Sequence, residues 1–297
     1  MNPNDRVNLA GRPVGRMGFG AMQLPGPGVF GPPQDKATAL AILRRAVDAG
    51  VNHVDTAQFY GPDVANDLIF EALHPYPEDL VIVSKVGARR DGTGQWLGAQ
   101  RPEELRAGVE ANLASLRVEQ VPVVNLRRHP GGDVPLADQL AAMVAMRDEG
   151  LIGGVGLSSV SLDEFREATD ATAIACVQNP YNVADRSDQG VFDACVAAGI
   201  PYVPFFPLGS AFMPDLPVLH HPAVTEVATR LGATPAQVAL AWLLRLSPLV
   251  LLIPGTSSLE HLEENLAAAN VELDEAAMDE LSGRGASSAS SAGTHTA

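Results

Sequence analysis

The chain has 297 residues, of which 46% are hydrophobic and 19% are charged, as is typical of a globular protein. The net charge of −15 would repel the phosphate backbone of nucleic acids, so nucleic acid is not an expected partner. No apolar run reaches the ~18 residues of a transmembrane helix, so a membrane is not an expected partner either.

A predicted β-hairpin around Gly11–Pro13 comes first, and short apolar runs then alternate with longer amphipathic runs. Strand-like runs lie at 17–22, 52–57, 80–86, 122–128, 153–158, 174–179, 201–206 and 249–254. Helix-like runs lie at 36–49, 63–73, 102–116, 135–149, 161–170, 188–198, 222–245 and 258–269. Eight β-then-α units predict an α/β fold, a (β/α)8 TIM barrel with an N-terminal β-hairpin and an extra C-terminal helix.

Capping-box signals mark three helix starts, at Ser161–Glu164, Thr234–Gln237 and Ser257–Glu260. Pro235 follows Thr234 at the first helical position, so the run 222–245 is predicted to be two helices.

A doubly wound dinucleotide-binding sheet is the main alternative fold. That fold needs a third glycine after Gly18-Phe-Gly20, with a helix starting there. The chain continues instead with Ala21, and the first helix starts about a dozen residues later. We therefore favour the barrel.

We expect one domain over residues 1–283, followed by a disordered tail over 284–297 that is small and polar. The N-terminus lacks the apolar segment of a secretion signal. Cys176 and Cys195 lie in apolar segments without metal-ligand spacing, as expected of buried free thiols. These features predict a cytoplasmic protein with no metal site.

Polar residues stand at the ends of the predicted strands, and the carboxyl ends of barrel strands meet at one face. They are Asp55, Tyr60, Lys85, Asn125, Arg127, His129, Ser158, Gln178 and Asn179. Strand alternation places Lys85 on the same face as Val81 and Val83, and Arg127 on the same face as Asn125.

Lys85 is the sharpest of these signals, because a lysine at the end of an apolar strand must be paired to be buried. Asp55 is the expected partner. The pair could serve the fold alone. With a tyrosine beside it, the ammonium would favour the phenolate, and the tyrosine could then give a proton to a carbonyl oxygen near neutral pH.

The segment Asp55-Thr-Ala-Gln-Phe-Tyr60-Gly61 resembles the D-T-A-x-x-Y-G motif of the aldo-keto reductases, and Lys85 lies where that family keeps its catalytic lysine. Further segments resemble family motifs in the same order, at Gly18–Met22, Gly156–Ser159, Gln178–Asn182, Phe205–Gly209 and Ile253–Asn265. The resemblance covers about residues 6–282.

The resemblance implies that Tyr60 is the general acid, that Lys85 activates it and that Asp55 holds Lys85. A hydride would pass from NADP(H) directly to the carbonyl carbon of a small substrate. Residues implied in cofactor binding are Gly20, Ala21, Met22, Asp55, Ser158, Ser159, Gln178, Phe205, Phe206, Pro207, Leu208, Gly209, Ser210, Ile253, Gly255, Thr256, Ser257, Ser258, His261, Glu264 and Asn265. We expect a monomer.

The fourth strand departs from the family, whose catalytic histidine ends that strand. Alignment puts Arg127 at this position, with His129 two residues later. Arg127 could donate hydrogen bonds to the carbonyl oxygen but could not exchange a proton near neutral pH. We favour Arg127 and keep His129 as the alternative.

Two further departures concern the cofactor. Ser159 replaces the asparagine of the family's serine–asparagine pair. Gly255 and His261 stand where many relatives carry a lysine and an arginine for the 2′-phosphate. The hydroxyls of Thr256, Ser257 and Ser258 at a helix start remain as phosphate donors. We expect NADP(H), with NAD(H) as the alternative.

Within the family, the chain is most similar to the bacterial pyridoxal reductase branch, which implies reduction of pyridoxal to pyridoxine. Met22, Phe30, Tyr60, Trp96 and Arg127 are the candidate lining of the substrate pocket, with Met213 as a further apolar candidate. The alternatives are a broad-specificity aldehyde-detoxifying reductase and a slow-turnover NADPH-binding module.

Overall fold

The computed structural model describes residues 6–129, 132–210, 215 and 217–283. The expected disordered tail and Met213 lie outside these residues. The described chain begins with β1 (Arg6–Leu9) and β2 (Arg12–Gly15), which pair antiparallel. The Asn8 side chain accepts a hydrogen bond from Gly11 N (2.7 Å) and stabilises the turn between them.

Six parallel strands form the main sheet in the order β10-β9-β8-β5-β4-β3. They are β3 (Phe19–Gly20), β4 (His53–Asp55), β5 (Val81–Val86), β8 (Val123–Arg127), β9 (Val155–Ser158) and β10 (Ile174–Gln178). The sheet curls so strongly that Gln178 on the edge strand β10 lies within hydrogen-bond distance of Asp55 on β4 and donates to it (2.8 Å).

The predicted strands at 201–206 and 249–254 are present only as extended segments joined by isolated bridges. Tyr202 bridges to Val177 of β10 and to Val250, and Leu252 bridges to Met17 ahead of β3. Prolines explain the missing ladder, because each removes a backbone donor. They stand at 201, 204, 207, 248 and 254.

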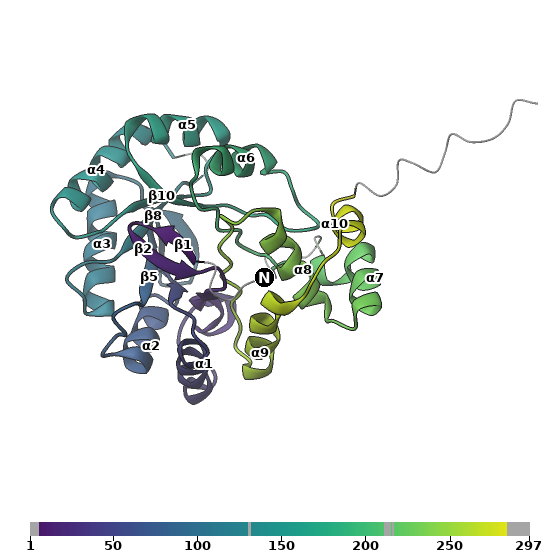
Figure 1. The fold of residues 1–297 in the computed structure, drawn as a ribbon. Coiled ribbons are helices and arrows are strands. Elements are labelled where there is room, and N and C mark those ends of the chain that lie inside the picture. The colour runs from purple at the N-terminus through teal and green to yellow at the C-terminus, as the bar shows by residue number, and fades with distance from the viewer. Residues whose placement is uncertain (1–5, 130–131, 211–214, 216, 284–297) are drawn as a thin grey trace, which may run out of the picture.

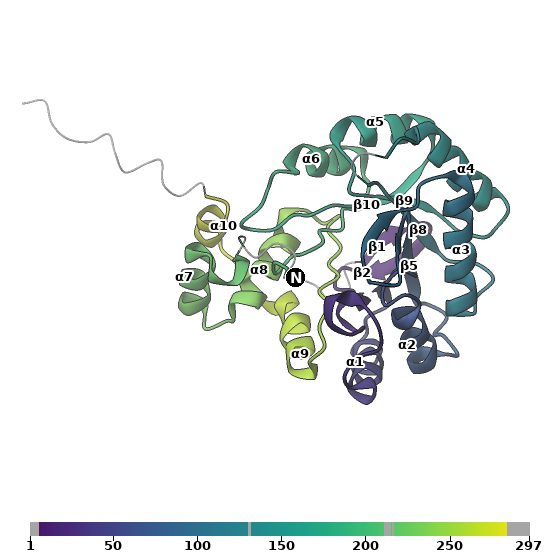
Figure 2. The same ribbon diagram turned by 180° about the vertical axis from the view of Figure 1, so that it is seen from behind.

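Ten α-helices lie in the described chain, and Figures 1 and 2 show them arranged around the outside of the sheet. They are α1 (Lys36–Asp48), α2 (Val64–Leu73), α3 (Pro102–Leu116), α4 (Leu136–Asp148), α5 (Leu162–Ala171), α6 (Gln189–Ala198), α7 (Pro222–Leu231), α8 (Pro235–Leu246), α9 (Leu259–Ala267) and α10 (Glu275–Leu281). None of the described helices is long and apolar enough to cross a membrane.

The helix starts follow the capping signals with one exception. The boxes at Ser161–Glu164 and Thr234–Gln237 form as expected, and the second separates α7 from α8. The predicted box at Ser257 is wrong by one residue, because Ser258 is the N-cap of α9 and accepts from His261 N (3.3 Å). The Thr256 hydroxyl accepts from Ser258 N (3.0 Å), which fixes this register.

A second antiparallel pair, β6 (Ala88–Arg90) and β7 (Trp96–Gly98), follows β5 and was not predicted. The Asp91-Gly92 dipeptide in its turn is a hairpin signal that could have found it. The Asp91 carboxylate accepts hydrogen bonds from Thr93 N (2.8 Å) and Gln95 N (3.0 Å).

Two apolar clusters form the core. The larger packs the outer face of the sheet against the helices. The smaller fills the inside of the curled sheet with Val81, Val83, Val123, Cys176, Val203, Leu251 and Ile253, and also includes Val7, Leu9 and Val14. The β1–β2 pair therefore covers the amino-terminal end of the strands, as its position in front of the sheet in Figure 1 and behind it in Figure 2 shows. The carboxyl ends remain open for a site.

Candidate active site

Asp55 and Lys85 form a buried ion pair where β4 and β5 end. Lys85 Nζ lies 2.5 Å from Asp55 Oδ1 and donates to the Thr56 carbonyl oxygen at 2.9 Å. Lys85 is 2% exposed and Asp55 3% exposed. Burial alone would lower the pKa of Lys85 and is the largest influence on it, but the attraction of Asp55 and Tyr60 outweighs burial and raises that pKa. Lys85 is therefore a fixed positive charge.

Gln178 holds the other side of this pair. Its Nε2 donates to Asp55 Oδ2 at 2.8 Å, so both carboxylate oxygens of Asp55 are engaged. We call Asp55, Lys85 and Gln178 the floor of the site. Each comes from a regular strand and each is at most 3% exposed.

His53 lies two residues before Asp55 on β4 and is 1% exposed. Burial lowers the pKa of His53 to about 4; Asp55 opposes this shift and Lys85 adds to it. Its Nδ1 has no hydrogen-bond partner among the described residues. A neutral imidazole is therefore buried on the same strand as Asp55 of the floor.

Tyr60 stands directly above the ion pair. Lys85 Nζ lies 5.0 Å from the centroid of its ring, and the ring packs edge-to-face on Phe59 at 5.4 Å. Gly61 makes the turn possible with φ 105°, where a Cβ would lie 2.4 Å from Val64 Cβ. The chain can thus leave β4 sharply and place Tyr60 against Lys85.

These groups line a cavity of about 310 Å³ at the carboxyl ends of the strands. Its lining includes the predicted residues Gly20, Met22, Asp55, Tyr60, Lys85, Trp96, Arg127, Gln178, Phe205, Phe206, Pro207, Leu208, Gly209, Ile253 and Gly255, together with Gln23 and Pro254. Met22 reaches it because the chain turns into a short 3-10 helix at Ala21–Gln23, where a longer strand was predicted. The cavity therefore gathers most of the predicted site.

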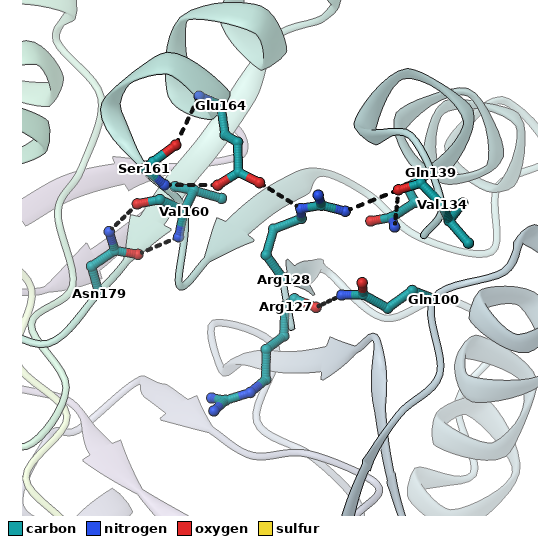
Figure 3. Close-up of polar contacts among 9 residues, drawn as sticks. All are labelled: Gln100, Arg127, Arg128, Val134, Gln139, Val160, Ser161, Glu164 and Asn179. Carbon is teal, nitrogen blue, oxygen red and sulfur yellow. Dashed lines mark hydrogen bonds and ion pairs between the residues drawn. The ribbon is translucent and has the colours of Figure 1, made fainter. Parts of the chain in front are cut away.

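The end of β8 distinguishes the two candidates for the fourth-strand position. Arg127 lines the cavity, whereas His129 is exposed and lies outside the lining. Figure 3 shows the Arg127 side chain extending in the opposite direction from Arg128. Arg128 pairs with Glu164 of α5 (2.8 Å), away from the site.

The main chain of Arg127 is held from two sides. Gln100 Nε2 donates to its carbonyl oxygen (3.0 Å), as Figure 3 shows. Gly87 packs so closely that a Cβ there would lie 2.3 Å from the same oxygen. Sequence reasoning missed both residues. Glycine at a strand end is a usable signal for such close backbone approach.

An aromatic wall, which we define as Phe30, Phe59, Arg90 and Trp96, stands beside the cavity. The Arg90 guanidinium lies 4.1 Å from the Trp96 ring centroid and 5.3 Å from that of Phe30. Arg90 also donates to the carbonyl oxygens of Val29 (2.8 Å) and Gly94 (2.6 Å). Only Trp96 of these four lines the cavity. Phe30, predicted to line the pocket, stacks behind it on Arg90.

Ser158 ends β9 beside Gln178, and Ser159 follows it. Ser158 is fully buried, and its hydroxyl has no hydrogen-bond partner among the described residues. Ser159 has φ 58°, in the left-handed region where asparagine is enriched, and its N–H donates to the Gln178 carbonyl oxygen (3.1 Å). A buried hydroxyl without a partner suits a polar ligand group placed beside Gln178.

A second hollow of about 480 Å³ shares Met22 and Gln23 with the cavity. Its lining includes Ser210 and Ser257, two of the predicted cofactor residues, and also Asp35 and Thr38 at the start of α1. Other predicted cofactor residues line neither hollow: Ala21, Ser158, Ser159, Thr256, Ser258, His261, Glu264 and Asn265. The described residues hold no cluster of three His, Cys, Asp or Glu side chains that could bind a metal.

Both cysteines are free and buried, as predicted. Cys176 lies inside the curled sheet, donates to Asn125 Oδ1 (3.3 Å), and burial raises its pKa to about 12. It therefore stays a thiol and takes no part in the chemistry above it.

Comparison with known proteins agrees with this site. The model of the aldo/keto reductase family matches residues 16–283. The chain is 48% identical to pyridoxine 4-dehydrogenase of Escherichia coli over 285 residues, which cover 94% of this chain and 98% of that protein. The crystal structure of a thermostable aldo-keto reductase in complex with the inhibitor epalrestat has a TM-score of 0.78 at 30% identity, covering 94% of this chain and 98% of that one. An aldo-keto reductase from Klebsiella pneumoniae in complex with NADPH has a TM-score of 0.78 at 25% identity, covering 93% of each chain.

The chain belongs to the aldo/keto reductase family. It is an oxidoreductase that converts a carbonyl group to the alcohol, and the expected pyridoxal reductase branch is confirmed by the 48% identity.

Proposed function

We propose that the chain reduces pyridoxal to pyridoxine with NADPH as the hydride donor. One observation carries the residue roles: the buried Asp55–Lys85 pair, Tyr60 and the Arg127 guanidinium line one cavity. The relative in Escherichia coli, named for the reverse reaction, supports the substrate.

Tyr60 donates the proton. As the carbonyl carbon accepts a hydride, its oxygen takes the proton of the Tyr60 hydroxyl. One C–H and one O–H bond form on the substrate, and the C–H bond of the hydride donor and the O–H bond of Tyr60 break. Lys85 stabilises the phenolate that remains until solvent returns the proton. Lys85 can do so because Asp55 and the Thr56 carbonyl oxygen hold its ammonium in place.

Arg127 takes the place of the family's histidine in this proposal. Its guanidinium donates hydrogen bonds to the carbonyl oxygen as negative charge develops there, and it keeps its own protons. The exposed position of His129 supports this choice.

The two hollows, which share Met22 and Gln23 in their linings, suit an extended dinucleotide. When bound, the nicotinamide cofactor supplies the hydride. Ser158 and Gln178 would hold its carboxamide, and the unpartnered Ser158 hydroxyl fits that role. Phe205 would offer a ring face, with Leu208, Gly209 and Ser210 beside the phosphates.

The adenosine end would lie at the start of α9. Ser257 lines the second hollow, while the hydroxyls of Thr256 and Ser258 accept hydrogen bonds from Ser258 N and His261 N at the helix start. A helix N-terminus with one available hydroxyl favours a 2′-phosphate. We therefore propose NADPH over NADH, by a smaller margin than a lysine–arginine pair would give.

The bridged segments around Tyr202 and Val250 would complete an eight-stranded barrel closed by the β1–β2 hairpin, within one domain over residues 1–283. Backbone hydrogen bonds between them support this proposal, since Tyr202 N donates to Leu249 O (3.0 Å) and Leu251 N donates to Tyr202 O (3.0 Å).

The test is NADPH oxidation with pyridoxal against a panel of small aldehydes. We expect kcat/KM for pyridoxal to exceed the panel by about tenfold or more. Equal values across the panel would identify a broad-specificity reductase. Tight NADPH binding without turnover of any aldehyde would identify a binding module. Full activity in a chelator is expected.

A further inference from the structure

The cavity carries a charge opposite to that of the chain. Its charged lining residues are Asp55, Lys85 and Arg127, one carboxylate and two cations, which give a formal charge of +1. The chain as a whole carries −15. Asp55 and Lys85 neutralise one another, so the excess charge belongs to Arg127.

Arg127 makes no ion pair within the described part of the chain. Its neighbour Arg128 pairs with Glu164, so the carboxylate near this strand end binds the arginine that lies outside the cavity. Gln100 and Gly87 hold the Arg127 main chain, and Figure 3 shows its side chain extended. A half-buried guanidinium held in this way is a preformed anion site.

We propose that Arg127 selects aromatic aldehydes that carry an ionised hydroxyl on the ring carbon next to the aldehyde. This inference rests on the proposed function and names its substrate class. When the aldehyde group of such a molecule turns its oxygen towards the phenolate oxygen, the two oxygens lie side by side and can share one donor. The planar fork of a guanidinium donates two parallel hydrogen bonds to such a pair, which a lysine ammonium does not match.

The rest of the lining fits the same class. Trp96, Phe205 and Leu208 offer apolar surface to a flat ring, and Tyr60 remains as the proton donor to the carbonyl oxygen. The Arg127 guanidinium stabilises the phenolate oxygen in the ground state. It stabilises the carbonyl oxygen in the transition state, as negative charge develops there. A ring hydroxyl elsewhere would leave half of the fork without a partner.

The experiment uses three probes, 2-hydroxybenzaldehyde, 2-methoxybenzaldehyde and 3-hydroxybenzaldehyde, with the wild-type chain and Arg127→Met, Arg127→Lys and Arg128→Met. The readout is the ratio of kcat/KM for the 2-hydroxy probe to that for each other probe, so a general loss of rate cancels. Arg128→Met is the matched control, because it removes a cation from the same strand end outside the cavity.

We expect both kcat/KM ratios to be at least about ten times as large in wild type and Arg128→Met as in Arg127→Met. Arg127→Lys should give intermediate ratios. Absorbance gives a second readout: the phenol of bound 2-hydroxybenzaldehyde should ionise at a lower pH on wild type than on Arg127→Met.

Equal ratios in wild type and Arg127→Met, with every rate lowered alike, would overturn the inference and leave Arg127 as a general carbonyl donor. An unchanged phenol titration between the two would also overturn it. Failure of the wild-type chain to reduce any of the three probes or pyridoxal would contradict the proposed function itself, and so the two failures are distinguishable.

Discussion

The floor of the cavity and its aromatic wall are held in place by different forces. The floor residues sit on regular strands, are at most 3% exposed and are joined by hydrogen bonds to the Asp55 carboxylate. Three members of the wall, Phe30, Arg90 and Trp96, lie in the segment before α1 and on the β6–β7 hairpin, and they are joined by cation–π contacts and bonds to carbonyl oxygens. The fourth, Phe59, follows β4 and packs edge-to-face on Trp96. Charge-assisted bonds in a low-dielectric interior are the stronger kind.

The difference separates chemistry from recognition. A floor fixed by the sheet can hold the Lys85 ammonium in place beneath Tyr60, while a wall whose Phe30, Arg90 and Trp96 are partly exposed can change the shape of the pocket. Variants in the floor should therefore lower kcat, and variants in the wall should mainly raise KM.

The largest effect is expected for Tyr60→Phe, which removes the proton donor and leaves the ring packed on Phe59. We expect kcat to fall about a thousandfold, within the range for loss of a general acid. NADPH binding, measured by fluorescence titration, should be unchanged. Retention of more than a tenth of wild-type kcat would rule out Tyr60 as the donor and break the assignment of chemistry to the floor and the tyrosine above it.

The stability of the floor should depend on pH through His53. The pKa of His53 in the folded chain, about 4, lies below the ordinary histidine value of 6.5, so the unfolded chain binds a proton first as the pH falls. The stabilisation is fully present above pH 6.5 and is lost towards pH 4, by about 3 kcal/mol in total.

Urea unfolding from pH 7 to pH 4 measures this loss. His53→Asn should show a flatter dependence than wild type, while His220→Asn, at an exposed position, should follow wild type. Parallel curves for wild type and His53→Asn would show that the buried imidazole does not control the stability of the floor.

Arg127 differs from floor and wall: it lines the cavity from a strand end, but it has no ion pair with any residue that the structure describes. Arg127→Met should lower kcat about a hundredfold, as loss of an oxyanion donor does. His129→Ala should change kcat by less than about twofold, because surface changes have small effects. If His129→Ala alone loses kcat, the assignment of the fourth-strand position to Arg127 is wrong.

The sequence predicted the floor better than the wall for a physical reason. A lysine ending an apolar strand and a D-T-A-x-x-Y-G segment are constrained by buried charge and by chemistry, so residue types alone reveal them. Phe30 and Trp96 looked alike in sequence, yet only Trp96 lines the cavity. Their difference depends on Arg90, whose contacts come from a hairpin that periodicity did not indicate.

The fold shows the same limit. Strand patterns at 52–57 and 80–86 gave regular ladders, whereas 201–206 and 249–254 have equally apolar patterns and only isolated bridges. The prolines within and beside these segments were the sequence feature that indicated the missing ladder. The prediction of Ser257 as the N-cap was wrong by one residue, because Ser257 and Ser258 carry the same side chain. The hydrogen bond from Ser258 N to the Thr256 hydroxyl selects Ser258.

The smallest expected effect concerns the wall itself. Arg90→Met removes the cation between Trp96 and Phe30 and the bonds to the Val29 and Gly94 carbonyl oxygens. A partly exposed cation–π contact is worth about 0.5–1 kcal/mol, so KM for an aromatic aldehyde should rise about fivefold with kcat little changed. The fluorescence emission of Trp96 should shift, and Trp96→Phe separates its contribution from that of the buried Trp242.

Arg90→Lys is the control for this prediction. It keeps a cation over the rings and should bring KM part of the way back to the wild-type value. If kcat falls about a hundredfold instead, the wall positions Tyr60 through Phe59, and the separation of chemistry from recognition fails.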